Sequence, residues 1–282
     1  MNFIKNLNNI EQYQMKKVIF TDIDGTILDG TRGFPRVSEK NLYALKQIRE
    51  NGSYVIISSG RSHSIINKEI LDTKPAGFIL CNGSYIEVNG EVIYKSVLEK
   101  KAIDCIVECT KTCHGLCIYE THDIVGTTDA NEELIAFFMK QWNMPSVDII
   151  VRETGDQEIY KMLPAFLSET DCKNFEQLLN HEFELKKQKG VLAYDVTSKH
   201  ITKGEALKKV LNYLHMDKKD AIAFGDSMND VDMLKEAGTG VAVLNADSYL
   251  KENADELCED CLEDGFYHWL VRKGIIIEMI SV

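Results

Sequence analysis

Short apolar runs alternate with amphipathic stretches in the first part of the chain. The runs at 17–20, 54–57 and 77–81 are short, apolar and rich in β-branched or aromatic residues, so we expect them to form buried strands. The stretches between them predict helices at 38–52, where apolar residues fall three positions apart, and at about 62–71. This alternation predicts a parallel sheet with helices on both faces.

The same alternation returns after Gly190. The expected elements are strands at 191–196, 220–224 and 240–243 and helices at 203–214, 230–237 and 247–253. The segments 1–83 and 190–282 are therefore expected to form one α/β core with a Rossmann-like parallel sheet.

The residues between these segments, 84–189, follow a different pattern, which indicates a compact inserted α+β domain. Alternating residues flank Asn89-Gly90, a dipeptide that favours a tight β-hairpin. A Ser-x-x-Asp pattern that starts at Ser168 resembles a helix-capping box. The helix after this capping box is expected to end at about Asn180. Two other helices are expected, one at about 99–113 and one that starts near Asn131, together with strands near 116–121, 146–152 and 158–163.

The charge of the chain limits its partners. The 282 residues include 32 Lys and Arg against 44 Asp and Glu, a net charge of −12 at pH 7. An acidic surface repels the phosphates of nucleic acids, so we expect no nucleic-acid partner. A small anionic substrate would need a local cation, either a metal ion or a buried lysine, to offset this field.

Apolar runs and cysteines bear on where the protein acts. No run of about 20 apolar residues exists, and residues 1–14 contain no apolar signal core, so we expect no membrane span and a cytoplasmic protein. Eight cysteines without a disulfide framework are typical of reduced thiols. The spacing of Cys105, Cys109, Cys113 and Cys117 leaves a soft-metal site open, but burial by packing is the commoner use of cysteine.

Polar residues directly follow three of the predicted core strands. Asp22 and Asp24 follow the first strand, Ser59 follows the second, and Asp226 follows the strand that ends at Phe224. Ligands gather at the carboxyl ends of the strands in open parallel sheets. We therefore expect these four side chains to converge, although they are far apart in the sequence.

The segment DIDGT, which starts at Asp22, is a candidate metal site. Asp22 and Asp24 are two residues apart, so in an extended chain their carboxylates face a common space. Two carboxylates held together repel each other, and a divalent cation removes that conflict. Oxygen ligands favour Mg²⁺, and Asp226 is a candidate third carboxylate. The structural alternative is a solvated turn that bends at Gly25.

The segment GDSMND adds Asn229 and Asp230 to this group. Asp230 falls at an expected helix start, where it would hold the cation through a water or brace a neighbour, although an acid is favourable there without any metal. Asn229 is a candidate phosphate or substrate donor. The hydroxyl of Ser59 and the backbone N–H groups around Gly60 make a candidate phosphate cradle before a helix, but serine also caps helices without a ligand.

Lys203 stands at the start of another predicted helix. A lysine there opposes the helix dipole, which indicates an anionic partner nearby. It is a candidate to neutralise a phosphoryl oxygen and to hold Asp22. The alternative for Lys203 is an exposed side chain. Two interpretations also remain for Arg61, which either pairs with acids near the site or is solvated.

Together these residues resemble the four ordered motifs of the haloacid dehalogenase (HAD) superfamily. The matching segments are DIDGT, Ser59-Gly60-Arg61, Lys203-Gly204 and GDSMND. The insertion between the second and third motifs resembles the α/β cap of the Cof-type sugar-phosphatase branch, and the resemblance runs from Val18 to about Leu270. It implies the HAD fold, with a catalytic core of 1–83 and 190–282 and a substrate-specificity cap of 84–189.

The resemblance also implies a Mg²⁺-dependent phosphatase for a small phosphate monoester, a sugar phosphate or similar metabolite. Asp22 would attack phosphorus to form an aspartyl-phosphate, and Asp24 would protonate the leaving oxygen and then activate water. Mg²⁺ would be held by Asp22, Asp226 and the backbone carbonyl of Asp24, and Asp230 would support this metal shell. The residues expected to contact the phosphoryl group are Ser59, Gly60, Lys203 and Asn229.

Two positions depart from the pattern of the family. Ser59 stands where the second motif commonly carries threonine, which keeps the hydroxyl and should not disable phosphate binding. Leu244 precedes Asn245-Ala246 where relatives often have Gly-Asn-Ala, so we expect a different turn close to the site.

Two other functions stay open. A phosphomutase-type relative would pass the phosphoryl group to a sugar instead of water, and the motifs fit both reactions. A non-catalytic metabolite-binding domain of the same fold is the other candidate. Intact Asp22, Asp24, Lys203 and Asp226 argue against it, because a binding protein has no need of a nucleophile and an acid together.

Overall fold

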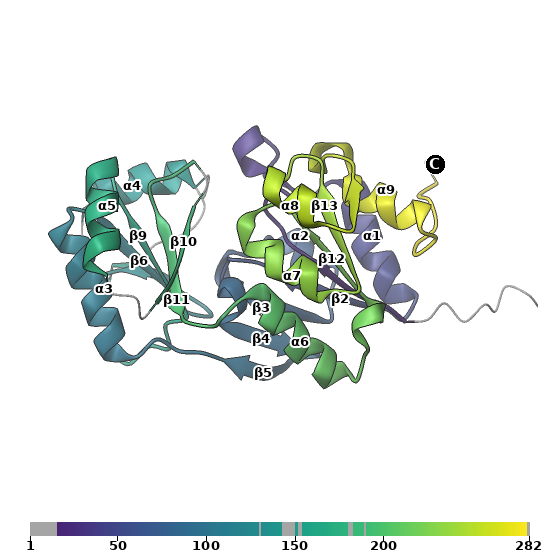
Figure 1. The fold of residues 1–282 in the computed structure, drawn as a ribbon, viewed down its shortest axis with the longest axis horizontal. Helices are drawn as coiled ribbons and strands as arrows, with labels where there is room; N and C mark the ends of the chain where they lie inside the picture. The colour runs from purple at the N-terminus through teal and green to yellow at the C-terminus, as the bar shows by residue number, and fades with distance from the viewer. Residues whose placement is uncertain are drawn as a thin grey trace, which may run out of the picture.

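The computed structural model describes residues 16–129, 131–142, 150–151, 154–179, 183–188 and 190–280. These residues form two β-sheets, which lie in two lobes of the molecule (Figure 1). The expectations for residues 1–14, and most of the strand expected near 146–152, lie outside the described residues. None of the described helices combines the length and apolar character that crossing a bilayer requires.

The larger sheet has eight strands in the order β14-β13-β12-β1-β2-β3-β4-β5. These strands are β1 Val18–Thr21, β2 Tyr54–Ser58, β3 Gly77–Leu80, β4 Tyr85–Val88, β5 Glu91–Lys95, β12 Ala221–Gly225, β13 Thr239–Val243 and β14 Glu256–Cys258. Neighbouring strands from β14 to β3 pair in parallel, and β4 and β5 are antiparallel. The predicted α/β class with a parallel-sheet core is confirmed, with an antiparallel edge added.

Helices cover both faces of this sheet (Figure 1). The pair α1 Glu39–Glu50 and α9 Gly265–Arg272 packs together, and so does the pair α6 Lys203–Leu214 and α7 Val231–Glu236. A shorter helix, α8 Ser248–Asn253, packs against α7 and β13. Most bounds lie within one or two residues of those expected, because capping side chains such as Ser38, which accepts from the N–H of Asn41 at 3.1 Å, mark the helix starts.

The helix expected at about 62–71 is broken into two short pieces. A 3₁₀ turn covers His63–Ile65, and α2 covers Lys68–Leu71, with Ile66 extended between them. The guanidinium of Arg61 donates to the carbonyl oxygen of Ile65 at 3.0 Å and to Asn67 Oδ1 at 2.7 Å. This side chain therefore occupies a carbonyl that a continuous helix would use for its own ladder.

The smaller sheet has six strands in the order β10-β11-β9-β6-β7-β8. They are β6 Leu116–Glu120, β7 Val125–Thr127, β8 Ile150–Val151, β9 Lys161–Ala165, β10 Phe183–Lys187 and β11 Tyr194–Ser198. Its helices are α3 Lys100–Thr112, α4 Glu132–Gln141 and α5 Glu169–Leu178. The strand expected at 158–163 begins and ends later than predicted.

Side chains alternate across the smaller sheet and separate two apolar clusters. Cys117 and Tyr119 of β6 pack with residues of α3 and α5, whereas Leu116 and Ile118 pack with Phe138 of α4. Successive strand residues point to opposite faces, so α4 lies on the face opposite to α3 and α5. The cysteines of the spaced group, Cys105, Cys109, Cys113 and Cys117, all belong to the first cluster, which supports packing as their role.

Strand pairing moves two expected boundaries. Strands β4 and β5 pair into the larger sheet, although residues 84–95 were assigned to the insertion, and β11 pairs into the smaller sheet, although residues after 190 were assigned to the core. The link from β3 to β4 is only the turn Cys81–Gly83, which is too short for a parallel crossover. The hairpin at Asn89 and Gly90, both with positive φ, therefore folds back along β3.

Candidate active site

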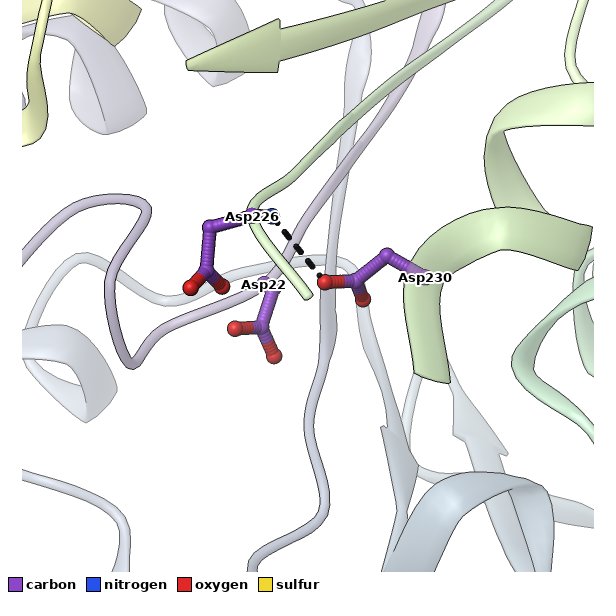
Figure 2. Close-up of side chains that lie close together, drawn as sticks. All are labelled: Asp22, Asp226 and Asp230. Atoms are coloured by element: carbon purple, nitrogen blue, oxygen red, sulfur yellow. Dashed lines mark hydrogen bonds between the residues drawn. The ribbon is translucent and has the colours of Figure 1, made fainter. Parts of the chain in front are cut away.

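Asp22 and Asp226 lie at the carboxyl ends of two adjacent parallel strands. Thr21 of β1 pairs with Phe224 of β12, and the N–H of Asp22 continues this ladder by donating to the carbonyl oxygen of Phe224 at 3.0 Å. Both carboxylates therefore reach the same edge of the sheet, where they are buried (Figure 2). With Asp230 they form a group in which each offers an oxygen within 4.8 Å of the others.

Asp230 braces the segment that carries Asp226. Its Oδ2 accepts a hydrogen bond from the N–H of Asp226 at 3.1 Å (Figure 2) and another from the N–H of Ser227 at 3.2 Å. A Cβ on Gly225 would lie 2.5 Å from the Cβ of Asp230, so only glycine lets the strand end approach this closely. Of the two roles expected for Asp230, the structure shows the bracing contact.

Lys203 binds two of the three carboxylates. Its Nζ lies 2.6 Å from Asp22 Oδ1 and 2.7 Å from Asp230 Oδ1, and its side chain is fully buried. Thr202 caps α6 by accepting from the N–H of Glu205, which places Lys203 in the first turn. The alternative of an exposed lysine is therefore wrong, and the unfavourable position against the helix dipole is offset by two anions.

The electrostatics of this group favour the binding of a cation. Burial, together with the nearby Asp230 and Asp24, raises the pKa of Asp22 to about 7 against the opposing effect of Lys203. Burial and the neighbouring Asp22 also raise the pKa of Asp226 well above its usual range. For Lys203, burial lowers the pKa, but the carboxylates of Asp22 and Asp230 outweigh it and raise the pKa overall.

A divalent cation fits these residues. Three ionised carboxylates and one ammonium leave two negative charges in excess, which one Mg²⁺ would neutralise. Among the described residues, Asp226 Oδ1 is buried and has no hydrogen-bond partner, so it is an available ligand atom. Carboxylate oxygens suit a hard cation of this kind.

The side chain of Asp24 does not join the acidic group. Its carboxylate accepts two hydrogen bonds from Arg61, at 2.6 and 2.8 Å, and its side chain is half-exposed. Asp24 stays outside this group because β1 ends at Thr21 and the chain turns at Gly25, whose φ is +84°. Its carboxylate is still close enough to raise the pKa of Asp22. Of the two interpretations of Arg61, pairing with an acid is the one that the structure shows.

The backbone after Asp24 approaches the acidic group instead. A Cβ built on Gly25 would lie 2.2 Å from Asp226 Oδ2, so the main chain of this turn packs directly against that carboxylate. Asn245 supports the turn, because its Nδ2 donates to the carbonyl oxygen of Gly25 at 2.7 Å. Leu244, where the family pattern was broken, is half-exposed and leaves this contact intact.

Ser59, Gly60 and Asn229 lie in a second polar group. The Oγ of buried Ser59 accepts from the N–H of Arg61 at 3.2 Å. Asn229 Nδ2 donates to Asn82 Oδ1 at 3.0 Å, and a Cβ on Gly60 would lie 3.2 Å from the same oxygen. Asn82 was not identified from the sequence, although it follows β3 and the rule of strand ends applies to it as well.

Comparisons with known proteins show what this chain is similar to. Residues 19–270 match the family model of the haloacid dehalogenase-like hydrolases. The candidate phosphatase YkrA of Bacillus subtilis is 30% identical to this chain, over 92% of this chain and 98% of YkrA. The phosphoglycolate phosphatase of Methanobrevibacter smithii is 31% identical, over 88% of this chain and 94% of that enzyme. Among solved structures, the HAD subclass IIB sugar phosphatase BT4131 is 27% identical with a TM-score of 0.78, over 93% of this chain and 100% of that chain.

Proposed function

Since the chain belongs to the haloacid dehalogenase-like hydrolases, we propose that it is a Mg²⁺-dependent phosphatase that hydrolyses small phosphate monoesters, such as sugar phosphates. One observation carries the proposal: the buried carboxylate of Asp22 is held by Lys203 beside Asp226, one oxygen of which has no partner in the described part of the chain. The named relatives support the reaction class, because they are phosphatases of a two-carbon acid and of sugars.

Asp22 acts as the nucleophile in this proposal. Its attack on phosphorus forms an aspartyl-phosphate and releases the alcohol, and water then hydrolyses this intermediate, so one difficult step becomes two easier ones. Asp24 gives a proton to the leaving oxygen and later takes one from water. Its half-exposed carboxylate suits a group that must meet both solvent and the leaving group.

The remaining residues bind charge. Mg²⁺, held by Asp22, Asp226 and the backbone carbonyl of Asp24, would stabilise the negative charge that builds up on the phosphoryl oxygens. Lys203 keeps Asp22 in place and offers a second cation. The groups proposed to contact the phosphoryl oxygens are Ser59, the backbone at Gly60, Lys203 and Asn229.

The lobe with the smaller sheet is the proposed cap, which excludes water and recognises the leaving group. We place the reaction in the cytosol, because all eight cysteines are free thiols in the structure.

The test is a turnover screen over phosphate monoesters with Mg²⁺ and with chelator. We expect the wild type to release phosphate only with Mg²⁺, and Asp22→Asn to lose about 10³-fold or more of this activity. Asp217→Asn, which changes an exposed acid paired with Lys219, is the matched control and should keep it. Wild-type turnover by Asp22→Asn would contradict the nucleophile, and transfer to an added sugar would indicate a mutase.

A further inference from the structure

Three charged side chains of the smaller sheet form a buried group that faces the other lobe. Lys161 of β9 lies 3.0 Å from Glu120 of β6 and 3.4 Å from Asp195 of β11. The side chains of Lys161 and Glu120 are only 4% and 3% exposed. No sequence motif marked these residues, and the proposed reaction does not yet use them.

Lys161 also reaches out of its own sheet. Its Nζ donates to the carbonyl oxygen of Gly60 at 2.5 Å, in the segment proposed to bind phosphate. Burial lowers the pKa of Lys161, but the carboxylates of Asp195 and Glu120 outweigh burial and raise it. The side chain is therefore a fixed ammonium that two anions aim at one backbone carbonyl.

The planar peptide unit carries this contact to the binding groups. The carbonyl of Gly60 and the N–H of Arg61 belong to one rigid plane and point in opposite directions. That N–H donates to Ser59 Oγ at 3.2 Å. Fixing the carbonyl through Lys161 therefore also fixes the peptide N–H and the serine hydroxyl.

A second contact ties the same group to the segment GDSMND. Asp195 Oδ2 accepts from Asn82 Nδ2 at 2.8 Å, and Asn82 Oδ1 accepts from Asn229 at 3.0 Å. A Cβ on Gly60 would lie 3.5 Å from Asp195 Oδ2, an ordinary van der Waals distance, so the segment is in contact with this network. The contacts of Lys161 and Asp195 thus brace two segments of the larger lobe from the smaller one.

We propose that Lys161 is a positioning residue through which the smaller lobe holds the Ser59-Gly60-Arg61 segment in the geometry that binds the phosphoryl group. The inference rests on the proposed phosphatase function. It assigns the smaller lobe a role toward phosphate itself, which is common to every ester, and not only toward the leaving group.

The first experiment compares Lys161→Met with the wild type in Mg²⁺. In calorimetry with inorganic phosphate, the variant should bind phosphate at least about tenfold more weakly than wild type, as is usual when a supporting contact is lost. The value of kcat/KM should fall by a similar factor for a sugar phosphate and for acetyl phosphate, whose leaving group is small. Lys95→Met is the matched control, because it removes an exposed pair between the lobes, Lys95 with Glu158, and should change phosphate binding less than about twofold.

A second variant separates the loss of the Lys161 contact from the effects of misfolding and of a changed net charge. Lys161→Met alone leaves Glu120 buried without its cation, which can prevent folding. The double change Lys161→Met with Glu120→Gln keeps the net charge of the three-residue group at −1. We expect this double variant to fold, by circular dichroism, and to show the same loss of phosphate affinity.

The outcomes separate the two proposals. Phosphate affinity within about twofold of wild type in the folded double variant would overturn the role of Lys161 and leave the phosphatase function standing. A loss of kcat/KM that is confined to large leaving groups would also overturn it, because Lys161 would then act on the leaving group. A wild-type protein that neither binds phosphate nor hydrolyses any ester would overturn both.

Discussion

At the scale of single residues, the site concentrates groups that destabilise one another. Three buried carboxylates lie together, the one ammonium beside them binds only Asp22 and Asp230, and Asp226 keeps an oxygen without a partner among the described residues. Such an arrangement raises the free energy of the folded protein unless a cation binds. Close backbone approach is part of the same design, because Gly25 has no side chain to separate its turn from Asp226.

This close approach can be tested with two glycines of similar conformation. Gly25 has a φ of +84° and Gly33 a φ of +88°, so alanine costs about 1 kcal/mol of backbone strain at either position. Of the two, only Gly25 would bring the new Cβ against a carboxylate, whereas no atom of the described residues lies within 4 Å of it at Gly33. We expect Gly25→Ala to lower kcat/KM by about 10²-fold, because displaced catalytic groups are that costly.

Steady-state kinetics and thermal unfolding measure the two effects separately. Gly33→Ala should unfold at a lower temperature and keep its kcat/KM. Equal kinetics for the two variants would show that the turn at Gly25 does not position the acidic group.

The sequence predicted much of this site at the residue scale, for a physical reason. Asp22 and Asp226 directly follow strands, so the geometry of parallel sheets brings them together. Asp24 lies beyond the end of the strand, where side chains no longer alternate with a period of two residues, and its carboxylate pairs with Arg61. Lys161 lies inside a strand of the other lobe, so only the relative placement of the two sheets reveals its contact with Gly60.

At the scale of elements, local signals were reliable where packing and capping agreed. Helix α6 has the bounds that its pattern indicated, because Thr202 caps it and one face is buried. The single helix expected at 62–71 is wrong, because the contact of Arg61 with the carbonyl oxygen of Ile65 interrupts it. Arg61 is held there by Asp24, which is distant in the sequence, so the local pattern does not reveal the break. The hairpin at Asn89 was recognised, but the alternating pattern does not say which sheet it joins.

A tie between two loop elements predicts a pH dependence of stability. Arg32, at the end of the 3₁₀ turn Gly30–Arg32, binds Asp29 at 2.5 Å and Asp260 at 2.9 Å. The hydrogen bond from Arg32 lowers the pKa of Asp260. Burial raises the pKa of Asp29, but hydrogen bonds from Thr31 and Arg32 outweigh it and lower the pKa overall.

The lowered pKa values set the direction of the effect. Their contribution to stability is fully present above the ordinary aspartate pKa of about 3.9, and it is lost as the pH falls through the lower folded values. We therefore expect Arg32→Met to be less stable than wild type at pH 7, with the difference shrinking below about pH 4. Urea unfolding from pH 7 to pH 3 measures this.

Lys68→Met, which removes the exposed pair with Asp72, is the control and should differ little from wild type at any pH. A gap between Arg32→Met and wild type that stayed constant down to pH 3 would contradict the linkage.

At the scale of the whole molecule, polar and aromatic contacts join the two lobes (the lobes are seen in Figure 1). They include the exposed pair of Lys95 and Glu158, the packing of Tyr85 against Tyr160, and the buried contact of Lys161 with Gly60. Since the contact of Lys161 ends on the proposed phosphate-binding segment, our proposal couples the position of the smaller lobe to the geometry of the site. The net charge of −12 adds to the importance of this edge of the sheet. An acidic protein repels an anionic substrate, so the substrate needs the local cations found there.

Metal binding should therefore appear as stability of the whole protein. A ligand that binds only the folded state at about 100 times its dissociation constant adds about 2.7 kcal/mol to the free energy of unfolding. We expect Mg²⁺ to raise the unfolding temperature of the wild type and of Asp217→Asn, and to have no such effect on Asp226→Asn. Without metal the order reverses: Asp226→Asn should be at least as stable as wild type, because it removes a carboxyl whose pKa is raised by burial and by Asp22 and Asp230, which costs folding free energy at neutral pH. Differential scanning calorimetry with Mg²⁺ and with chelator tests both halves. A variant that is clearly less stable than wild type in chelator would mean that Asp226 serves the fold itself, since a residue kept for its metal is expected to destabilise the protein when the metal is absent.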